Sequence, residues 1–185
     1  MDLAKLAVWL AGTQSSIALH ESLYMYPLIE SLHVIAITVF VGTIAMVDLS
    51  LLGYAFAGTP VSEMTRRILP WTVAGFVIMA ITGVLLFYAI PVRTYHSVWF
   101  RLKVVLLLVA AINIWIFHCR VQRERERWDR DPVPLLGARV CAAISLMVWA
   151  SVVVAGRMIA YNWADCDRSQ PGWINWLAQC ASYGG

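Results

Sequence analysis

Three ionisable residues, Glu30, His33 and Asp48, lie within the long apolar stretch of residues 28–57. An ionisable side chain is costly to expose to lipid, so each of them is expected to face the interior of a helix bundle. An imidazole there can ligate a haem iron or a copper ion, and a nearby carboxylate can orient the ring or pair with a cation. The stretch therefore predicts a cofactor or ion site inside the membrane.

Two levels of polar residues follow when the apolar stretches are placed as membrane crossings of alternating direction. His33 and Asp48 are about 22 Å apart along one helix, and Lys103 and His118 have the same spacing on another. The outer level contains Glu30, His33, Arg101, Lys103 and Arg157, with His96 and His20 at its rim. The inner level contains Asp48, Asn113, His118 and Arg139.

The outer level suits a haem or a copper site. In the first case His33 and a second imidazole ligate b-type haem axially, and cationic side chains meet the propionates. In the second case the histidines bind copper together with Met25, because imidazole and thioether suit that metal. The candidate haem-binding residues are His33, His96, Arg101, Lys103 and Arg157, and the candidate metal ligands are His33, His96 and His20.

A third use of the polar residues is purely structural. The charged groups then only pair with one another, Glu30 with Arg157 and Asp48 with Arg139, and so fix the packing of the helices. His118 lies at a helix end without a second histidine at its level, so it is interpreted as meeting water or Asp48. The residues leave these three uses open.

The composition requires lipid around most of the chain. Of its 185 residues, 61% are hydrophobic and 14% are charged, whereas a soluble domain averages roughly 45–50% apolar and 25% charged residues. We predict one all-α integral membrane domain over residues 1–185, folded as a four-helix bundle. The mixed-charge run at 124–131 is interpreted as a solvated helix extension, so nucleic acid is not expected as a partner.

Stretches of about 20 apolar residues, enough to cross a hydrocarbon core of roughly 30 Å, define the elements that position these side chains. The predicted spans are 28–57, 69–91, 98–118 and 136–161. Short helices on the membrane surface are predicted at 2–11 and 14–26, because aromatic residues suited to the interface lie there. The connections are a loop at 58–68, a turn at 92–97 and a charged loop at 119–135, and a polar tail follows at 162–185.

The positions of the arginines predict the orientation. They gather in the 58–68 and 119–135 connections, which the positive-inside rule places in the cytoplasm of a bacterial inner membrane. Both termini are then outside. The tail there contains Cys166 and Cys180, and an oxidising periplasm permits a disulfide between them.

Three segments, SLHVIAITVFVGTIAMVDLSLL, WTVAGFVIMAITGVLLFY and WFRLKVVLLLVAAINIWIFH, resemble the first three helices of a group of small bacterial membrane proteins. The group is related to the copper-resistance D domain and to the HemJ type of protoporphyrinogen oxidase. The resemblance implies haem ligation by His33 and a functional Lys103, or else copper uptake. Ala45 stands where the oxidases carry an arginine, so oxidase activity is not carried over. The matching positions are His33 and Gly42, Thr82 and Gly83, and Lys103 and Asn113.

The leading functional prediction is a b-type haem-binding redox protein with its haem near the periplasmic side. It would pass electrons between the quinone pool and a periplasmic partner, either as a quinone-linked oxidoreductase or as an electron-transfer subunit. The alternatives are a copper-binding or copper-transport protein and a cofactor-free structural subunit of a larger membrane complex.

Overall fold

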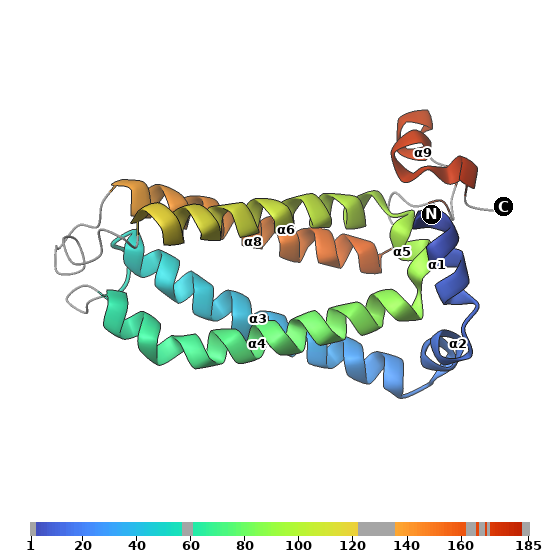
Figure 1. Cartoon of the computed structure of the whole chain (residues 1–185), viewed down its shortest axis with the longest axis horizontal. Coiled ribbons are helices and arrows are strands. Elements are labelled where there is room, and N and C mark those ends of the chain that lie inside the picture. The colour runs from blue at the N-terminus through green and yellow to red at the C-terminus, as the bar shows by residue number, and fades with distance from the viewer. Residues whose placement is uncertain are drawn as a thin grey trace. The chain divides into compact units, whose positions relative to one another are not determined.

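The computed structural model describes residues 3–56, 61–121, 136–161, 166, 169 and 171–182. Every regular element within these residues is helical, which confirms the predicted all-α class. The long helices are α3 (Met25–Leu51), α4 (Val61–Ala89), α6 (Val98–Ile116) and α8 (Leu136–Ala160), and a π-helical turn at Phe117–Val121 continues α6 (Figure 1). The shorter ones are α1 (Leu3–Ala11), α2 (Gln14–Glu21), α5 (Pro91–Tyr95), α9 (Gly172–Ala178) and the 3-10 turn η3 (Cys180–Ser182).

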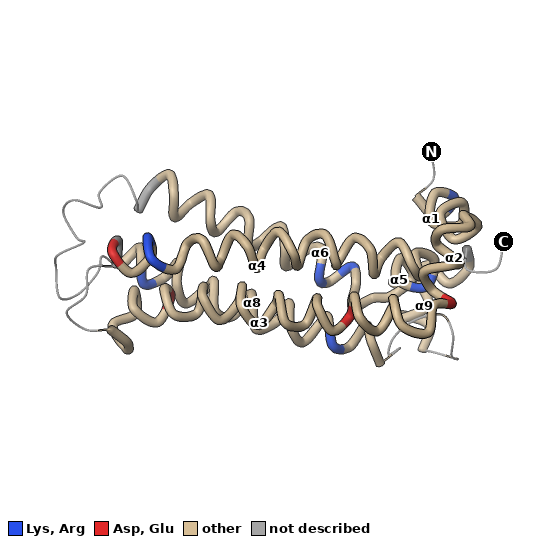
Figure 2. The backbone as a smooth tube through the Cα atoms, turned by 90° about the horizontal axis from the view of Figure 1, so that it is seen from below, with Lys and Arg blue, Asp and Glu red and all other residues tan. Residues whose placement is uncertain are grey.

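Within the described residues, four helices are long and apolar enough to cross a membrane. They are α3, α4, α6 and α8, and Figure 2 shows few charged residues along them. Large apolar side chains such as Ile35, Leu108 and Trp115 are exposed on these helices, although exposure to water would be unfavourable. Lipid accounts for that exposure, so the chain is a multi-pass membrane protein.

The first span ends at Leu51, six residues before its predicted end. Gly53 has a φ of +82°, in the left-handed region that glycine enters without steric cost. The backbone N–H of Tyr54 then donates to Leu49 O at 3.0 Å, as in a glycine-terminated helix. The predicted end at residue 57 was wrong because the apolar residues continue past this glycine.

All three predicted connections are helical in part where the structure describes them, and residues 119–121 of the third belong to the π-helical turn Phe117–Val121. Helix α4 begins at Val61, inside the predicted loop 58–68, and an exposed ion pair between Arg67 and Glu63 at 2.6 Å lies on its first turns. Helix α5 begins at Pro91, the last residue of the predicted second span, and occupies most of the predicted turn at 92–97. Residues 57–60 and 122–135, with the mixed-charge run, lie outside the described residues.

The described chain divides into two compact units, and both include part of each long helix. The first comprises the described residues of Met1–Val34, Met79–Val105 and Val153–Gly185. The second comprises those of Ile35–Ile78 and Leu106–Val152. A single membrane domain over the whole chain stays a prediction.

In the first unit, Tyr88 of α4 holds the short helix α2. Its hydroxyl hydrogen-bonds to the hydroxyls of Thr13 and Ser15 at 2.7 and 2.6 Å, and its carbonyl accepts from Ser16 Oγ at 2.7 Å. Thr13 also caps the N-terminus of α2, because its hydroxyl accepts from the backbone N–H of Ser16. The predicted helices before the first span are therefore present, and their place on the membrane surface stays a prediction.

In the second unit, aromatic residues pack where α3 and α4 approach closely. The Phe40 ring lies 5.5 Å from the Phe76 ring and 4.8 Å from the Trp149 ring, measured between centroids. A Cβ added at Gly75 would lie 3.0 Å from the backbone N of Phe40, so only glycine allows this approach. A Cβ at Gly42 would meet nothing within 4 Å in the described structure, so Gly42 does not stand at a close approach of this kind there.

Candidate functional site

The first unit positions His33 on α3 against Thr82 on α4. The His33 ring is half-buried, and its Nδ1 lies 2.8 Å from the Thr82 hydroxyl oxygen. That hydroxyl donates its own hydrogen to the Met79 carbonyl at 3.2 Å. If the one hydroxyl hydrogen of Thr82 is donated to Met79, Thr82 accepts from Nδ1–H of His33. Nε2 is then the unprotonated nitrogen, the form in which an imidazole ligates a metal.

Gly83, the residue after Thr82, makes room for the His33 ring. A Cβ added at Gly83 would lie 3.2 Å from Cε1 and 3.8 Å from Nδ1 of His33. The Thr82–Gly83 pair therefore fixes the imidazole in two ways: the hydroxyl sets its orientation and the glycine leaves its space open. The pair lies in the segment of α4 that the sequence resemblance singled out.

Lys103 and Trp99 present two hydrogen-bond donors from α6. The Lys103 side chain is partly buried, and its Nζ lies 3.5 Å from where a Cβ would stand at Gly156 on α8. The Lys103 ammonium is close enough to interact electrostatically with the His33 ring. Trp99 precedes Lys103 by one helical turn, so the two share a face of α6. In the described structure Trp99 Nε1 is buried and has no hydrogen-bond partner.

Trp99 was not predicted as a site residue. The signal was present as a four-residue spacing between a tryptophan and a lysine on a predicted crossing. Tryptophan near a membrane boundary is commonly an interfacial anchor, so this spacing alone does not indicate a ligand site.

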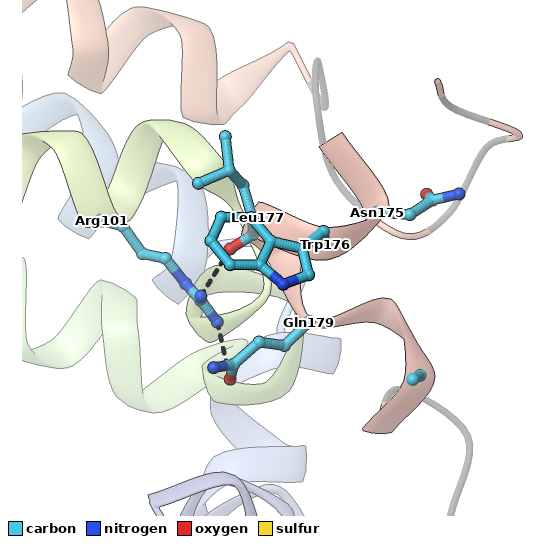
Figure 3. Close-up of a pocket in the computed structure, with 6 residues that line it drawn as sticks. Arg101, Asn175, Trp176, Leu177 and Gln179 are labelled. Atoms are coloured by element: carbon cyan, nitrogen blue, oxygen red, sulfur yellow. Dashed lines mark hydrogen bonds between the residues drawn. The ribbon is translucent and has the colours of Figure 1, made fainter. Parts of the chain in front are cut away.

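His96 and Arg101, predicted for the haem site, contact helix α9. His96 is only 2% exposed, and its Nδ1–H donates to the Ala178 carbonyl at 2.9 Å. Arg101 donates to the Leu177 carbonyl at 2.5 Å and to Gln179 Oε1 at 3.1 Å, as Figure 3 shows. These bonds satisfy carbonyls at the C-terminus of α9 that lack helical donors. The sequence did not predict this contact, because it did not predict α9.

A disulfide directly after α9 also restrains this part of the chain. Cys166 and Cys180, the pair predicted from the sequence, form a disulfide with an S–S distance of 2.08 Å and a Cα–Cα distance of 5.4 Å. A cavity of about 550 Å³ lies beside α9 and is lined by Arg101, Asn175, Trp176, Leu177, Gln179 and Ala181 (Figure 3). A second, apolar cavity of about 350 Å³ is lined by residues of α1, α4, α5 and α6, among them Leu6, Phe87 and Phe100.

The remaining outer residues are exposed in the structure. His20 lies edge-on to Tyr26, with 6.1 Å between ring centroids, and the Arg157 guanidinium lies 4.8 Å from the Tyr161 ring centroid. Glu30 is also exposed. Neither predicted ion pair, Glu30 with Arg157 or Asp48 with Arg139, is present among the described residues, where the ion pair found is Arg67 with Glu63.

In the second unit, Asp48 and Asn113 both contact α8. Asp48 is 6% exposed and accepts a hydrogen bond from the Ser145 side chain. Asn113 Nδ2 donates to the Cys141 carbonyl at 3.0 Å. His118 is exposed in the π-helical turn that follows α6. Helix α8 thus contacts two of the predicted inner residues, Asp48 and Asn113.

The described residues contain no cluster of three or more histidine, cysteine, aspartate or glutamate side chains that could hold a metal ion. The copper prediction depended on several histidines meeting at one site. In the structure His20 is exposed beside Tyr26, and His96 is buried against α9.

The four spanning helices and the buried polar contacts define an all-α multi-pass membrane protein. The chain belongs to the Family of unknown function (DUF6644), which matches residues 21–162. No curated protein and no solved structure matches the chain. The matched region includes His33, Thr82, Lys103 and Asp48, whereas α9 lies outside it. The resemblance to the copper-resistance D and HemJ-type proteins stays a prediction.

Proposed function

We propose that this protein is a membrane redox protein that binds b-type haem through Nε2 of His33. The observation that carries the proposal is the 2.8 Å contact between His33 Nδ1 and the Thr82 hydroxyl. A metal-ligating histidine commonly donates its other ring N–H to a fixed acceptor, which sets the tautomer and the direction of the free nitrogen. When bound, the haem would supply one-electron chemistry at its iron.

Lys103 and Trp99 would hold a carboxylate of the haem. An ammonium and an indole N–H one turn apart on α6 offer an anion one charged and one neutral hydrogen bond. The unpaired, buried Nε1 of Trp99 supports this assignment, because a buried donor without a partner costs free energy of about 1–3 kcal/mol. Arg101, predicted for the same task, has its guanidinium bonded to the end of α9.

The electron donor in this proposal is a membrane quinol, which is oxidised to the quinone, and the acceptor is a partner outside the membrane. The apolar cavity of about 350 Å³ beside Phe87 and Phe100 would admit the quinone. We further propose a bacterial inner membrane with both termini in the periplasm. The Cys166–Cys180 disulfide supports this, because such bonds persist in oxidising compartments. A reporter fused to the C-terminus should therefore read periplasmic.

The test is the absorption spectrum of the purified full chain, oxidised and dithionite-reduced, with iron and copper analysis of the same sample. His33→Ala should abolish the haem spectrum without preventing membrane insertion. His20→Ala and His118→Ala are matched controls, because both side chains are exposed, and they should retain the full haem content. A His33→Ala variant with a full haem complement would refute the proposal, whereas copper bound in place of haem would favour the copper alternative.

A second candidate function is a cofactor-free structural subunit of a membrane complex. It is favoured by the protein partners that His33, His96 and Arg101 already have, in Thr82 and in α9. Wild-type protein that contains neither haem nor metal would select this candidate. His33→Ala should then lower the melting temperature and change no spectrum.

A further inference from the structure

We infer that Asp48 is an intramembrane proton-binding site, in which a neutral carboxylic acid is held against Ser145 of α8. The inference goes beyond the proposed haem site and does not depend on it, because the residues that carry it are different ones. It would allow the protein to take up or release a proton from within the membrane.

The burial of Asp48 is the first observation. The residue is 6% exposed on a helix long enough to cross the membrane, and its Oδ2 has no hydrogen-bond partner in the described structure. An ionised carboxylate in such a place keeps its full desolvation cost unless a cation pairs with it. No lysine or arginine of the described residues pairs with Asp48. The neutral acid avoids that cost.

The surroundings of Asp48 suit a neutral acid. The Ser145 hydroxyl donates a hydrogen bond to the carboxyl. The thiol of Cys141, one turn earlier on α8, lies close enough for the carboxyl to act on it electrostatically. In the neutral form, the carbonyl oxygen of the acid still accepts from the Ser145 hydroxyl, and the proton resides on Oδ2, which has no other partner in the described structure.

Packing around this pair keeps water away. Leu51, Ala138 and Ala142 form a buried apolar cluster together with Cys141. On the other side, Asn113 of α6 donates to the Cys141 carbonyl at 3.0 Å and fixes that turn of α8. The carboxyl is therefore held by α8 and not by solvent.

The ligand set favours a proton over a metal ion. Hard divalent cations take six or more oxygen ligands. Asp48 and Ser145 offer one carboxylate and one hydroxyl, and no cluster of metal-binding side chains occurs in the described part of the chain. A proton needs one acceptor.

The experiment is infrared spectroscopy of the full chain in lipid vesicles at neutral pH. Wild-type protein should show the C=O stretching band of a protonated, water-shielded carboxylic acid. Asp48→Asn should remove the band, and Ser145→Ala should shift it because one hydrogen bond is lost. Glu30→Gln, at an exposed carboxylate of the same helix, and Ser151→Ala, whose hydroxyl donates to the Met147 carbonyl at 2.8 Å, should leave the band unchanged.

The melting temperatures of the same proteins, measured by thermal unfolding, provide an independent test. Asp48→Asn replaces a neutral acid by a neutral amide of the same shape, so its melting temperature should stay close to that of wild type. A band that is absent from wild type, or that persists in Asp48→Asn, would overturn the inference. It would also be overturned if Asp48→Asn melted several degrees lower and sodium chloride, compared with choline chloride, stabilised the wild type, because Asp48 would then be an ionised cation ligand.

Discussion

Two glycines of α4 should respond in opposite ways to the same substitution. At Gly75, an alanine Cβ would lie 3.0 Å from the backbone N of Phe40 and 3.3 Å from the backbone O of Ala36. Backbone atoms cannot turn aside, so the two helices must separate. Overpacking of this kind costs about 1–3 kcal/mol, and the higher helix propensity of alanine offsets about 1 kcal/mol. Gly75→Ala should therefore lower the free energy of unfolding by up to about 2 kcal/mol.

At Gly83, the new Cβ would lie 3.2 Å from Cε1 of His33, the end of a side chain that can rotate. If the turned ring gives its N–H a new partner, stability should stay level or rise by up to about 1 kcal/mol from the gain in helix propensity. The rotation, however, breaks the 2.8 Å contact between His33 Nδ1 and Thr82. Gly83→Ala should therefore lose haem while it keeps its fold, and Gly75→Ala should lose stability while its folded fraction keeps haem.

The assay pairs the thermal unfolding of the purified full chain in detergent with the haem absorbance per protein. Gly42→Ala is the control, because its Cβ meets nothing within 4 Å in the described structure, and it should lower neither quantity. If Gly83→Ala destabilises the protein as much as Gly75→Ala, the ring of His33 is not free to turn. If Gly83→Ala binds haem as the wild type does, His33 is not the ligand.

Two further predictions concern α9. Arg101→Met should speed amide hydrogen exchange in Gly172–Ala178, because the guanidinium bonds to that helix end are lost, each worth about 1.5–3 kcal/mol. Arg67→Met, which removes only an exposed ion pair, is the control, and unchanged exchange in Arg101→Met would contradict the contact. Peptide mass spectrometry of unreduced protein should find Cys166 linked to Cys180, and alkylation of both thiols without reductant would exclude the bond.

The spans and the buried polar residues could be predicted from the sequence because both signals are strong locally. A long apolar run fixes a crossing, and an ionisable residue within it must avoid lipid. Asp48 was found in this way, and it is buried. The ends of the helices were less certain, since the apolar run at residues 28–57 continues past Gly53, whose positive φ ends α3.

The partners of the polar residues could not be predicted. His96 bonds to a carbonyl of α9, which lies 82 residues later in the chain, and Thr82 meets His33 across 49 residues. Such contacts depend on how the helices pack, and spacing in the sequence does not encode that. The tail was predicted as polar because its apolar segment, Gly172–Ala178, is only seven residues long.

The Thr82 hydroxyl distinguishes the two candidate functions. Thr82→Val keeps the size of the side chain and removes the oxygen that lies 2.8 Å from His33 Nδ1. Thr82 is 3% exposed, so water cannot readily replace the lost acceptor. If His33 ligates haem, loss of this partner should weaken haem binding by about 10–100-fold and shift the reduction potential. If the pair is only structural, the unsatisfied ring N–H should cost about 1–3 kcal/mol of stability with no spectral change.

Potentiometric titration of the haem and thermal unfolding of the same preparations measure both outcomes for Thr82→Val. Thr82→Ser is the matched control, because it keeps the hydroxyl and should preserve haem affinity, potential and most of the melting temperature. A fall in haem affinity with little loss of stability supports the haem proposal, since the bond then acts on the free nitrogen of His33. A fall in stability alone supports the cofactor-free candidate. Thr82→Val protein that matches wild type in both measurements would mean that Thr82 does not orient the ring, and the argument that Nε2 is the free ligating nitrogen would fail with it.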